Sequence, residues 1–145
     1  MRKRKGIKIL AILTGMLIVI YALGPRPATP VYEKDLPQVP AAANELQAYI
    51  RHNEAMHKLK PDNEARIVWY NDSVKEKTPY SIVYLHGFSA SQEEGRPIHT
   101  NIAKEFGCNL YLSRLAEHGI DTADPMIRLT PGEYWKSAEQ ALAIG

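Results

Sequence analysis

Cysteine and a basic surface stripe are what this sequence most clearly lacks. Its single cysteine, Cys108, cannot form an internal disulfide, and its place beside an apolar run favours a small buried residue over a reactive thiol. No cysteine directly follows the apolar N-terminal segment, so a lipoprotein-type lipid anchor would lack its attachment point. Five of the 18 basic residues lie in the first eight positions, leaving 13 basic against 16 acidic residues in the rest. Such a mildly acidic body argues against nucleic acid as a partner.

A metal-binding pattern is also missing. His52 and His57 are five residues apart, and Glu54 does not directly follow His52. The zinc-protease motif His-Glu-x-x-His places its histidines one helical turn apart on one face. We therefore expect a solvated helix face here. Asp121 and Asp124 precede a proline turn and are expected to shape a loop, so neither a metal nor a cofactor is predicted.

The N-terminus has the pattern of an export or anchoring segment. Residues 1–8 are basic, and residues 9–23 carry no charge. This apolar run is of intermediate length between the core of a signal peptide and a full membrane span. Pro25 directly follows the small-residue site at 22–24 and should hinder cleavage, which favours a signal anchor over residues 1–24. The basic excess predicts a cytoplasmic N-terminus and an extracytoplasmic body, either periplasmic or extracellular.

Residues 25–40 contain five of the ten prolines. Proline at this density predicts an extended, semi-rigid spacer between the membrane segment and a body over residues 41–145.

The body alternates helical and strand-like patterns, which predicts the α/β class. Thr130 and Glu133 form a capping box around Pro131 at a helix start, and Gly107 is suited to end the preceding helix. His99 is expected on the solvated face of that preceding helix. The expected strands are 66–70, 80–85 and 109–113, and the expected helices are 41–59, 97–106 and 131–145. The first two strands are near enough in sequence to form a hairpin.

Residues 80–91, Tyr-Ser-Ile-Val-Tyr-Leu-His-Gly-Phe-Ser-Ala-Ser, are the most informative stretch. The apolar run predicts a buried strand of a parallel sheet, and the loop after it would present backbone N–H groups at the carboxyl end, where α/β sheets bind ligands. A strand ending in His-Gly-aromatic-Ser before a helix resembles the oxyanion-hole loop of the α/β-hydrolase superfamily. Its esterases, monoacylglycerol-lipase-like enzymes and serine aminopeptidases are the nearest in pattern.

The resemblance extends over residues 65–145 and implies the N-terminal part of a hydrolase domain, an incomplete α/β-hydrolase fold. It places strand 80–85 beside strand 109–113. Residues 114–119 are similar to the family's loop that ends in His-Gly after the fourth strand, although Ala116-Glu117 replaces the frequent Pro-Gly.

For the site, the resemblance implies that the backbone N–H of Phe88 is an oxyanion donor, with His86, Gly87 and Ser89 supporting the loop. Ser89 is not expected to be the nucleophile, because its surroundings lack the second glycine of Gly-x-Ser-x-Gly and no helix follows at once. His118 comes too early in the chain to be the family's catalytic base.

The implied activity is hydrolysis of carboxylic ester or amide bonds in a small-molecule substrate. No catalytic residue is expected within the chain itself. The nucleophile is expected after Gly145, so these residues would be an inactive N-terminal fragment of a membrane-anchored serine hydrolase. Two alternatives stay open. One is a non-catalytic, exported and membrane-anchored binding module that uses an exposed strand edge. The other is an unrelated α/β fold.

Overall fold

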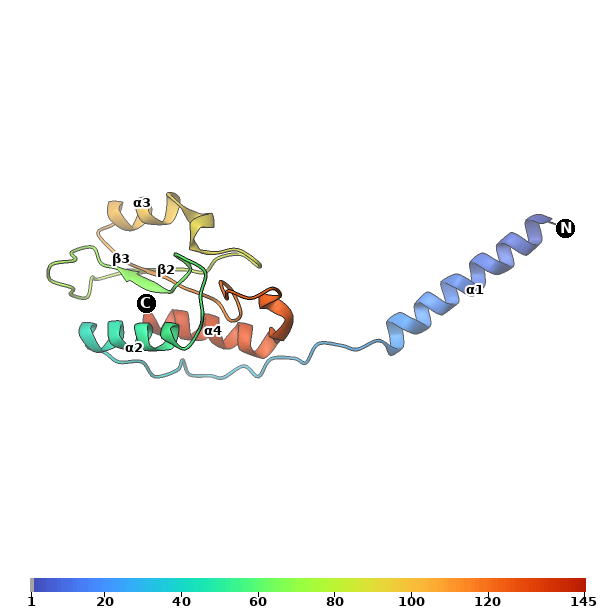
Figure 1. Cartoon of the computed structure of the whole chain (residues 1–145), viewed down its shortest axis with the longest axis horizontal. Helices are drawn as coiled ribbons and strands as arrows, with labels where there is room; N and C mark the ends of the chain where they lie inside the picture. Colours follow the sequence, from blue (N-terminus) through green and yellow to red (C-terminus); the bar gives the residue numbers. More distant parts are fainter. Residues whose placement is uncertain (1) are drawn as a thin grey trace.

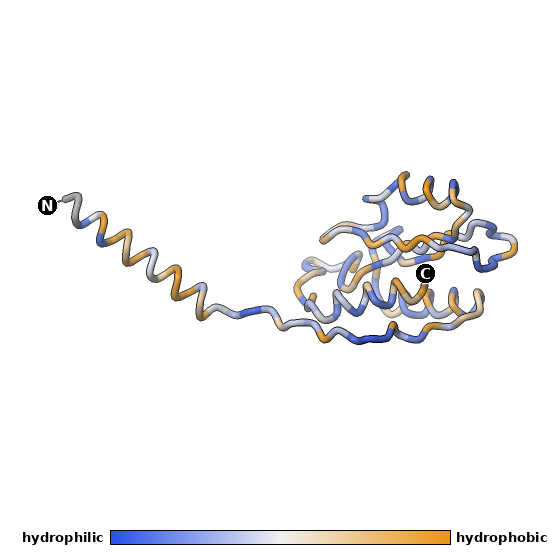
Figure 2. Tube along the Cα trace, turned by 180° about the vertical axis from the view of Figure 1, so that it is seen from behind, coloured by the Kyte–Doolittle hydropathy of each residue, from blue (hydrophilic) through white to orange (hydrophobic). Residues whose placement is uncertain are grey.

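The apolar N-terminal segment forms one long helix, α1 (Arg2–Leu23), set apart from the rest of the chain (Figure 1). This computed structural model describes residues 2–145, while Met1 and the side chains of residues 2–4 in the basic cluster lie outside the described part. Figure 2 shows that α1 is apolar along most of its length. Its 19-residue stretch Lys5–Leu23 rises about 28 Å, close to the roughly 30 Å core of a bilayer. By length and composition it suits a membrane span or a signal anchor.

The proline-rich segment between α1 and the body has neither helix nor strand. Part of this segment nevertheless contacts the body. The ring of Tyr32 packs edge-on against Trp135, with 5.0 Å between the ring centres. Val39 packs against the core of the body. The second half of this segment is therefore attached to the domain that it connects.

The predicted helices and strands are present in the predicted order, several of them shorter than expected. The described part of the body also contains two short 3₁₀ turns, η1 (Gln92–Gly95) and η2 (Pro125–Arg128). The remaining elements are α2 (Ala43–Ala55), β1 (Arg66–Val68), β2 (Ser81–Tyr84), α3 (Ile98–Glu105), β3 (Asn109–Leu112) and α4 (Pro131–Ile144). The Thr130–Glu133 capping box is confirmed, and Gly107 ends α3 with a φ of 64°.

The sheet has the strand order β1-β3-β2. β3 is central and pairs antiparallel with β1 and parallel with β2, so that Ile67 and Val83 both lie opposite Tyr111. The predicted hairpin between the first two strands is therefore wrong. Each pairs instead with β3, whose Leu110 is completely buried and occupies the middle of the sheet. Strand 80–85 does lie beside strand 109–113, as the resemblance implied.

Helices cover both faces of the sheet, α2 and α4 on one side and α3 on the other (Figure 1). Side chains alternate between the faces along each strand. Tyr111 joins the α2/α4 side, whereas Leu110 and Leu112 face Ala103 of α3. Cys108 is buried, as predicted. The core on the α2/α4 side comprises Leu46, Ile50, Ala65, Tyr111, Ala141 and Ile144.

His99 is buried, so its predicted solvated position is wrong. The helix face that packs on the sheet carries His99 and Ala103, whereas Ile98 is 67% exposed. The His99 ring packs edge-on against Tyr84, with 4.7 Å between the ring centres, and its Nε2 hydrogen-bonds the Gln92 carbonyl at 2.9 Å. The ring partner and the backbone acceptor compensate for part of the cost of burying the imidazole, whose Nδ1 has no hydrogen-bond partner among the described residues.

Candidate functional site

Two loops meet where the parallel strands β2 and β3 end. Each loop contributes one histidine. His86 comes after β2 and is followed by a turn, and His118 comes after β3 and lies within a turn. The two rings are 4.7 Å apart between centres, and the two residues are only 4% and 2% exposed. A pair of buried imidazoles at the carboxyl ends of parallel strands therefore forms the centre of this site.

His86 is held by one backbone donor and one backbone acceptor. Its Nε2 accepts the N–H of Leu115 at 3.1 Å, and its Nδ1 lies 3.0 Å from the Gly87 carbonyl. Because an amide N–H only donates and a carbonyl only accepts, these partners assign a neutral ring with the proton on Nδ1. Burial lowers the pKa of His86, and the neighbouring His118 lowers it further, while the Gly87 carbonyl opposes the shift.

His118 is held in the same way, with a backbone donor from the first loop and a backbone acceptor from its own loop. Its Nε2 accepts the N–H of Ser89 at 3.0 Å, and its Nδ1 donates to the Ala116 carbonyl at 2.8 Å. It too is assigned as the neutral ring protonated on Nδ1. Phe88 and Tyr134 pack around it, with ring centres at 6.0 and 5.7 Å.

The backbone of the first loop is closely constrained. The Gly87 N–H donates to the Glu94 carboxylate at 2.7 Å, and the Ala90 N–H donates to the Gly87 carbonyl at 3.2 Å. A Cβ on residue 87 would lie 3.0 Å from a Glu94 oxygen, so glycine permits this close approach. Ser89 has a φ of 61°, a left-handed conformation that costs a non-glycine residue about 1–3 kcal/mol.

Phe88 differs from its neighbours in this loop. The N–H groups of Gly87, Ser89 and Ala90 all have acceptors, but none of the described residues 2–145 accepts a hydrogen bond from the Phe88 N–H. The Phe88 side chain is 70% exposed. One backbone donor at the carboxyl edge of the sheet is therefore left for an external acceptor.

An ion pair beneath the second loop was not anticipated from the sequence. Glu54, expected on a solvated helix face, binds Arg114 through two contacts of 2.7 and 3.1 Å, and the two side chains are only 13% and 8% exposed. Glu54 also accepts the Ala65 N–H at 2.8 Å, and Arg114 reaches the His118 carbonyl at 3.3 Å. The prediction was wrong for Glu54, because its partner lies 60 residues away in sequence.

The other candidate residues lie apart from this centre. His52 and His57 are exposed, as predicted. Among the described residues, no group of three or more His, Cys, Asp or Glu side chains is placed to share a metal ion. Within the same part of the chain, no hydrogen bond joins the Ser89 hydroxyl to either histidine; the contact with His118 comes from the Ser89 backbone.

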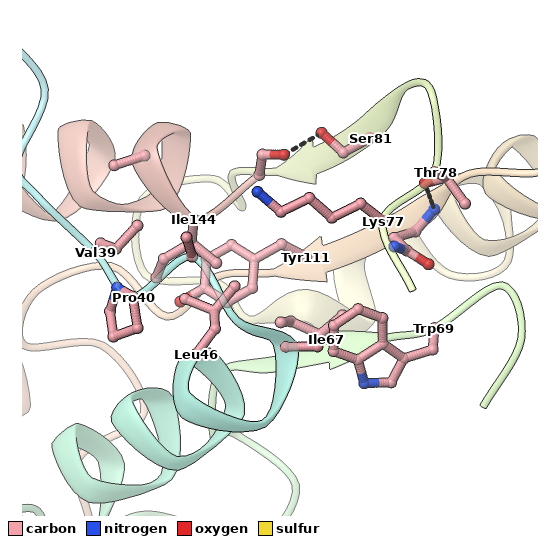
Figure 3. A pocket seen from close by; sticks show the side chains of 15 residues that line it. Val39, Pro40, Leu46, Ile67, Trp69, Lys77, Thr78, Ser81, Tyr111 and Ile144 are labelled. Carbon is pink, nitrogen blue, oxygen red and sulfur yellow. Dashed lines mark hydrogen bonds between the residues drawn. The ribbon is translucent and has the colours of Figure 1, made fainter. Parts of the chain in front are cut away.

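A hollow of about 290 Å³ adjoins the loop, and Lys60, Ser89, His118 and Met126 are among its lining residues. A second cleft, of about 240 Å³, lies at the opposite, amino-terminal ends of β2 and β3. Figure 3 shows Leu46 and Ile144 around this second cleft. Because α/β sheets bind ligands at the carboxyl ends of their strands, we place the candidate site at the hollow beside the histidines.

Comparisons with protein-family models, with curated proteins and with solved structures gave no match to this chain.

Proposed function

We propose that residues 86–90 are the oxyanion-binding loop of a serine hydrolase of the α/β-hydrolase type, acting on carboxylic ester or amide bonds. The observation that carries the proposal is the Phe88 N–H, which lies between the engaged amides of Gly87 and Ser89 and has no acceptor among the described residues. Such a donor would bind the carbonyl oxygen of a substrate and stabilise the negative charge that develops on it. The strand order β1-β3-β2, with only β1 antiparallel, supports the same family.

This loop would stabilise the negative charge on the substrate oxygen, but it supplies no nucleophile to attack the carbonyl carbon. Donors that are fixed before the reaction stabilise the tetrahedral intermediate without reorganising. Gly-x-Ser-x-Gly does not occur in residues 1–145, and neither histidine contacts a side-chain nucleophile in the described part. The attacking serine, its base and the second oxyanion donor are therefore assigned outside these residues in the proposed enzyme.

We also propose that the body acts outside the cytoplasm, tethered by α1. The basic residues that precede the apolar stretch favour a cytoplasmic N-terminus. The substrate would then reach the loop in the periplasm or outside the cell.

The test is labelling of the native protein in its source membranes with a fluorophosphonate, a reagent that modifies an activated serine. Labelling at a protein mass well above 16.3 kDa, with peptides of this chain in the labelled band, is the expected result. Phe88→Pro, which removes the backbone donor, should lower kcat about 10²- to 10³-fold. The matched control Phe88→Leu keeps the N–H and should retain most activity. Equal losses in both variants would contradict the assignment of the donor.

A non-catalytic, membrane-anchored binding module is the second candidate, favoured by one observation. β2 forms an edge of the three-stranded sheet and so presents backbone groups to which a partner strand could add. An unlabelled protein of 16.3 kDa in the native membrane would favour this candidate over the hydrolase.

A further inference from the structure

We propose that His86 and His118 form a proton-sensitive clasp, two positioning residues that fasten residues 86–90 to residues 113–119 and release them when the rings gain protons. The clasp concerns only the described loops and stands on their geometry. Its consequence for oxyanion binding rests on the proposed function.

The two histidines bind each other's loops reciprocally. His86 lies on the first loop and accepts the N–H of Leu115 on the second, while His118 lies on the second and accepts the N–H of Ser89 on the first. Each ring donates its Nδ1 proton to a carbonyl of its own loop, Gly87 for one and Ala116 for the other. The cross-links between the loops are thus the two Nε2 acceptors, and the Nδ1 bonds fix the tautomer that makes them acceptors.

Protonation removes both acceptors. An imidazolium carries a proton on each nitrogen and only donates, so its Nε2–H would face the backbone N–H that it now binds. Neither Leu115 nor Ser89 has another acceptor in the described part of the chain. Two charged rings with centres 4.7 Å apart would also repel each other at this depth of burial.

The surrounding charges do not stabilise two imidazolium rings equally. Glu94 holds the Gly87 N–H and its negative charge favours the protonated form of His86, whereas Arg114 binds the His118 carbonyl and its positive charge opposes that form. Tyr134 of α4 packs on His118, and Lys60 lines the hollow beside it. Arg114 is itself paired with Glu54. Apart from the adjacent Glu117, the groups named here around His118 are neutral, cationic or already paired.

The consequence reaches the loop backbone. Ser89 is held in its left-handed conformation by the bond from its N–H to His118. Loss of that bond lets residue 89 relax toward ordinary backbone angles. Phe88 lies between Gly87 and Ser89, so its N–H loses its fixed direction when residue 89 moves. The neutral clasp thus keeps the unpaired donor aligned, and acid releases it.

Sparse isotope labelling makes the clasp measurable in the full chain in detergent micelles. The sequence contains only two phenylalanines, Phe88 and Phe106. The Phe106 N–H, directly after the last residue of α3, donates to the Ile102 carbonyl and serves as an internal reference. Nitrogen-15 labels on phenylalanine and histidine then report the loop amide, the reference amide and the ring tautomers in one sample.

At about pH 8, we expect the rings of His86 and His118 to show the neutral tautomer protonated on Nδ1, whereas the third buried ring, His99, is expected to carry its proton on Nε2, which faces the Gln92 carbonyl. As the pH is lowered from about 8, the Phe88 amide should shift together with the protonation of His86, whose pKa burial lowers, while Phe106 stays constant. His86→Gln/His118→Gln, which offers non-titrating acceptors, should abolish the Phe88 response. His52→Gln, at an exposed position, should leave it unchanged.

A Phe88 amide that does not move while His86 gains its proton would overturn the clasp. So would an Nε2-protonated neutral tautomer on His86 or His118 in the wild-type chain, a measurement that needs no variant to fold. None of these readouts uses a substrate. A working clasp in a protein that resists fluorophosphonate labelling would therefore reject the proposed function and leave the clasp standing.

Discussion

Removal of one partner of the Glu54–Arg114 pair should destabilise the body more than removal of both. Glu54 stands near the end of α2, and Arg114 follows β3 at the base of the second histidine loop. The carboxylate accepts two guanidinium hydrogen bonds and the Ala65 N–H. With the two side chains 13% and 8% exposed, little water is present to solvate a charge left alone.

The magnitude follows from what each variant leaves behind. Glu54→Gln keeps an acceptor for Ala65 but leaves the guanidinium without a counter-charge, so we expect a loss of about 3 kcal/mol in unfolding free energy. Arg114→Met leaves the carboxylate unpaired at a similar cost. In Glu54→Leu/Arg114→Met no charge remains, and the main defect is the Ala65 N–H without an acceptor, which costs about 1–3 kcal/mol. The double variant should therefore unfold at a higher temperature than either single variant.

Near-ultraviolet circular dichroism during thermal unfolding of the full chain in detergent provides the measurement. For a body of about 100 residues, a loss of about 3 kcal/mol lowers Tm by roughly 12–24 °C. Lys58→Ala is the matched control, because its pair with Asp121 joins side chains that are 82% and 47% exposed. It should leave Tm nearly unchanged. If the loss of unfolding free energy in the double variant equals the sum of the two single losses, the reasoning that the pair is buried and coupled is refuted.

Two further predictions concern packing and pH. Gly95→Ala should destabilise the body by about 1–3 kcal/mol, because the added Cβ would overlap the rings of His99 and Tyr84. Gly132→Ala, which has open space around it in α4, should be neutral or stabilising. Chemical denaturation of the two variants measures the difference in unfolding free energy. Burial holds the pKa of His86 below its ordinary 6.5, so the unfolded chain takes up this proton first, and stability present above pH 6.5 should fall as the pH drops below it. Unfolding midpoints across this range should show the fall in the wild type and a flatter profile in His86→Gln; a flat wild-type profile would contradict the assignment.

The sequence was sufficient to predict the elements and their order, because the relevant signals are local. Apolar runs ended by turns mark β2 and β3, and the Thr130–Glu133 box marks the start of α4. Strand pairing is not local. β1 and β2 are neighbours in sequence, yet both pair with β3, and no pattern within residues 66–85 carries that information.

The burial of polar side chains could not be predicted for the same reason. Glu54 has the composition of an exposed helix around it, and only Arg114, 60 residues later, makes its burial favourable. His99 likewise depends on Tyr84 and on the Gln92 carbonyl. In each case the compensating group comes from another element, so a helical pattern read alone assigns the residue to solvent.

For the candidate site, the sequence identified both histidine loops but not their connection. His86-Gly87 and His118-Gly119 each follow a predicted strand, and two parallel neighbouring strands necessarily bring such loops to one edge. That repeated His-Gly pattern was the available signal. Which imidazole nitrogen accepts a hydrogen bond depends on backbone positions that only the folded loops define. The same is true of the bonds that the Leu115 and Ser89 N–H groups donate to the histidine of the other loop.

If α1 spans a membrane, the contact between Tyr32 and Trp135 limits how far the body can lie from the bilayer. If the whole proline-rich connection were free, residues 24–42 would extend roughly 60 Å at about 3.1 Å per residue. Because Tyr32 is attached to α4, only residues 24–31 remain as a leash, with a reach of about 25 Å. An anchored domain would then stay close to the lipid headgroups. There it would meet molecules embedded in or released from the membrane far more often than molecules dissolved far from the bilayer.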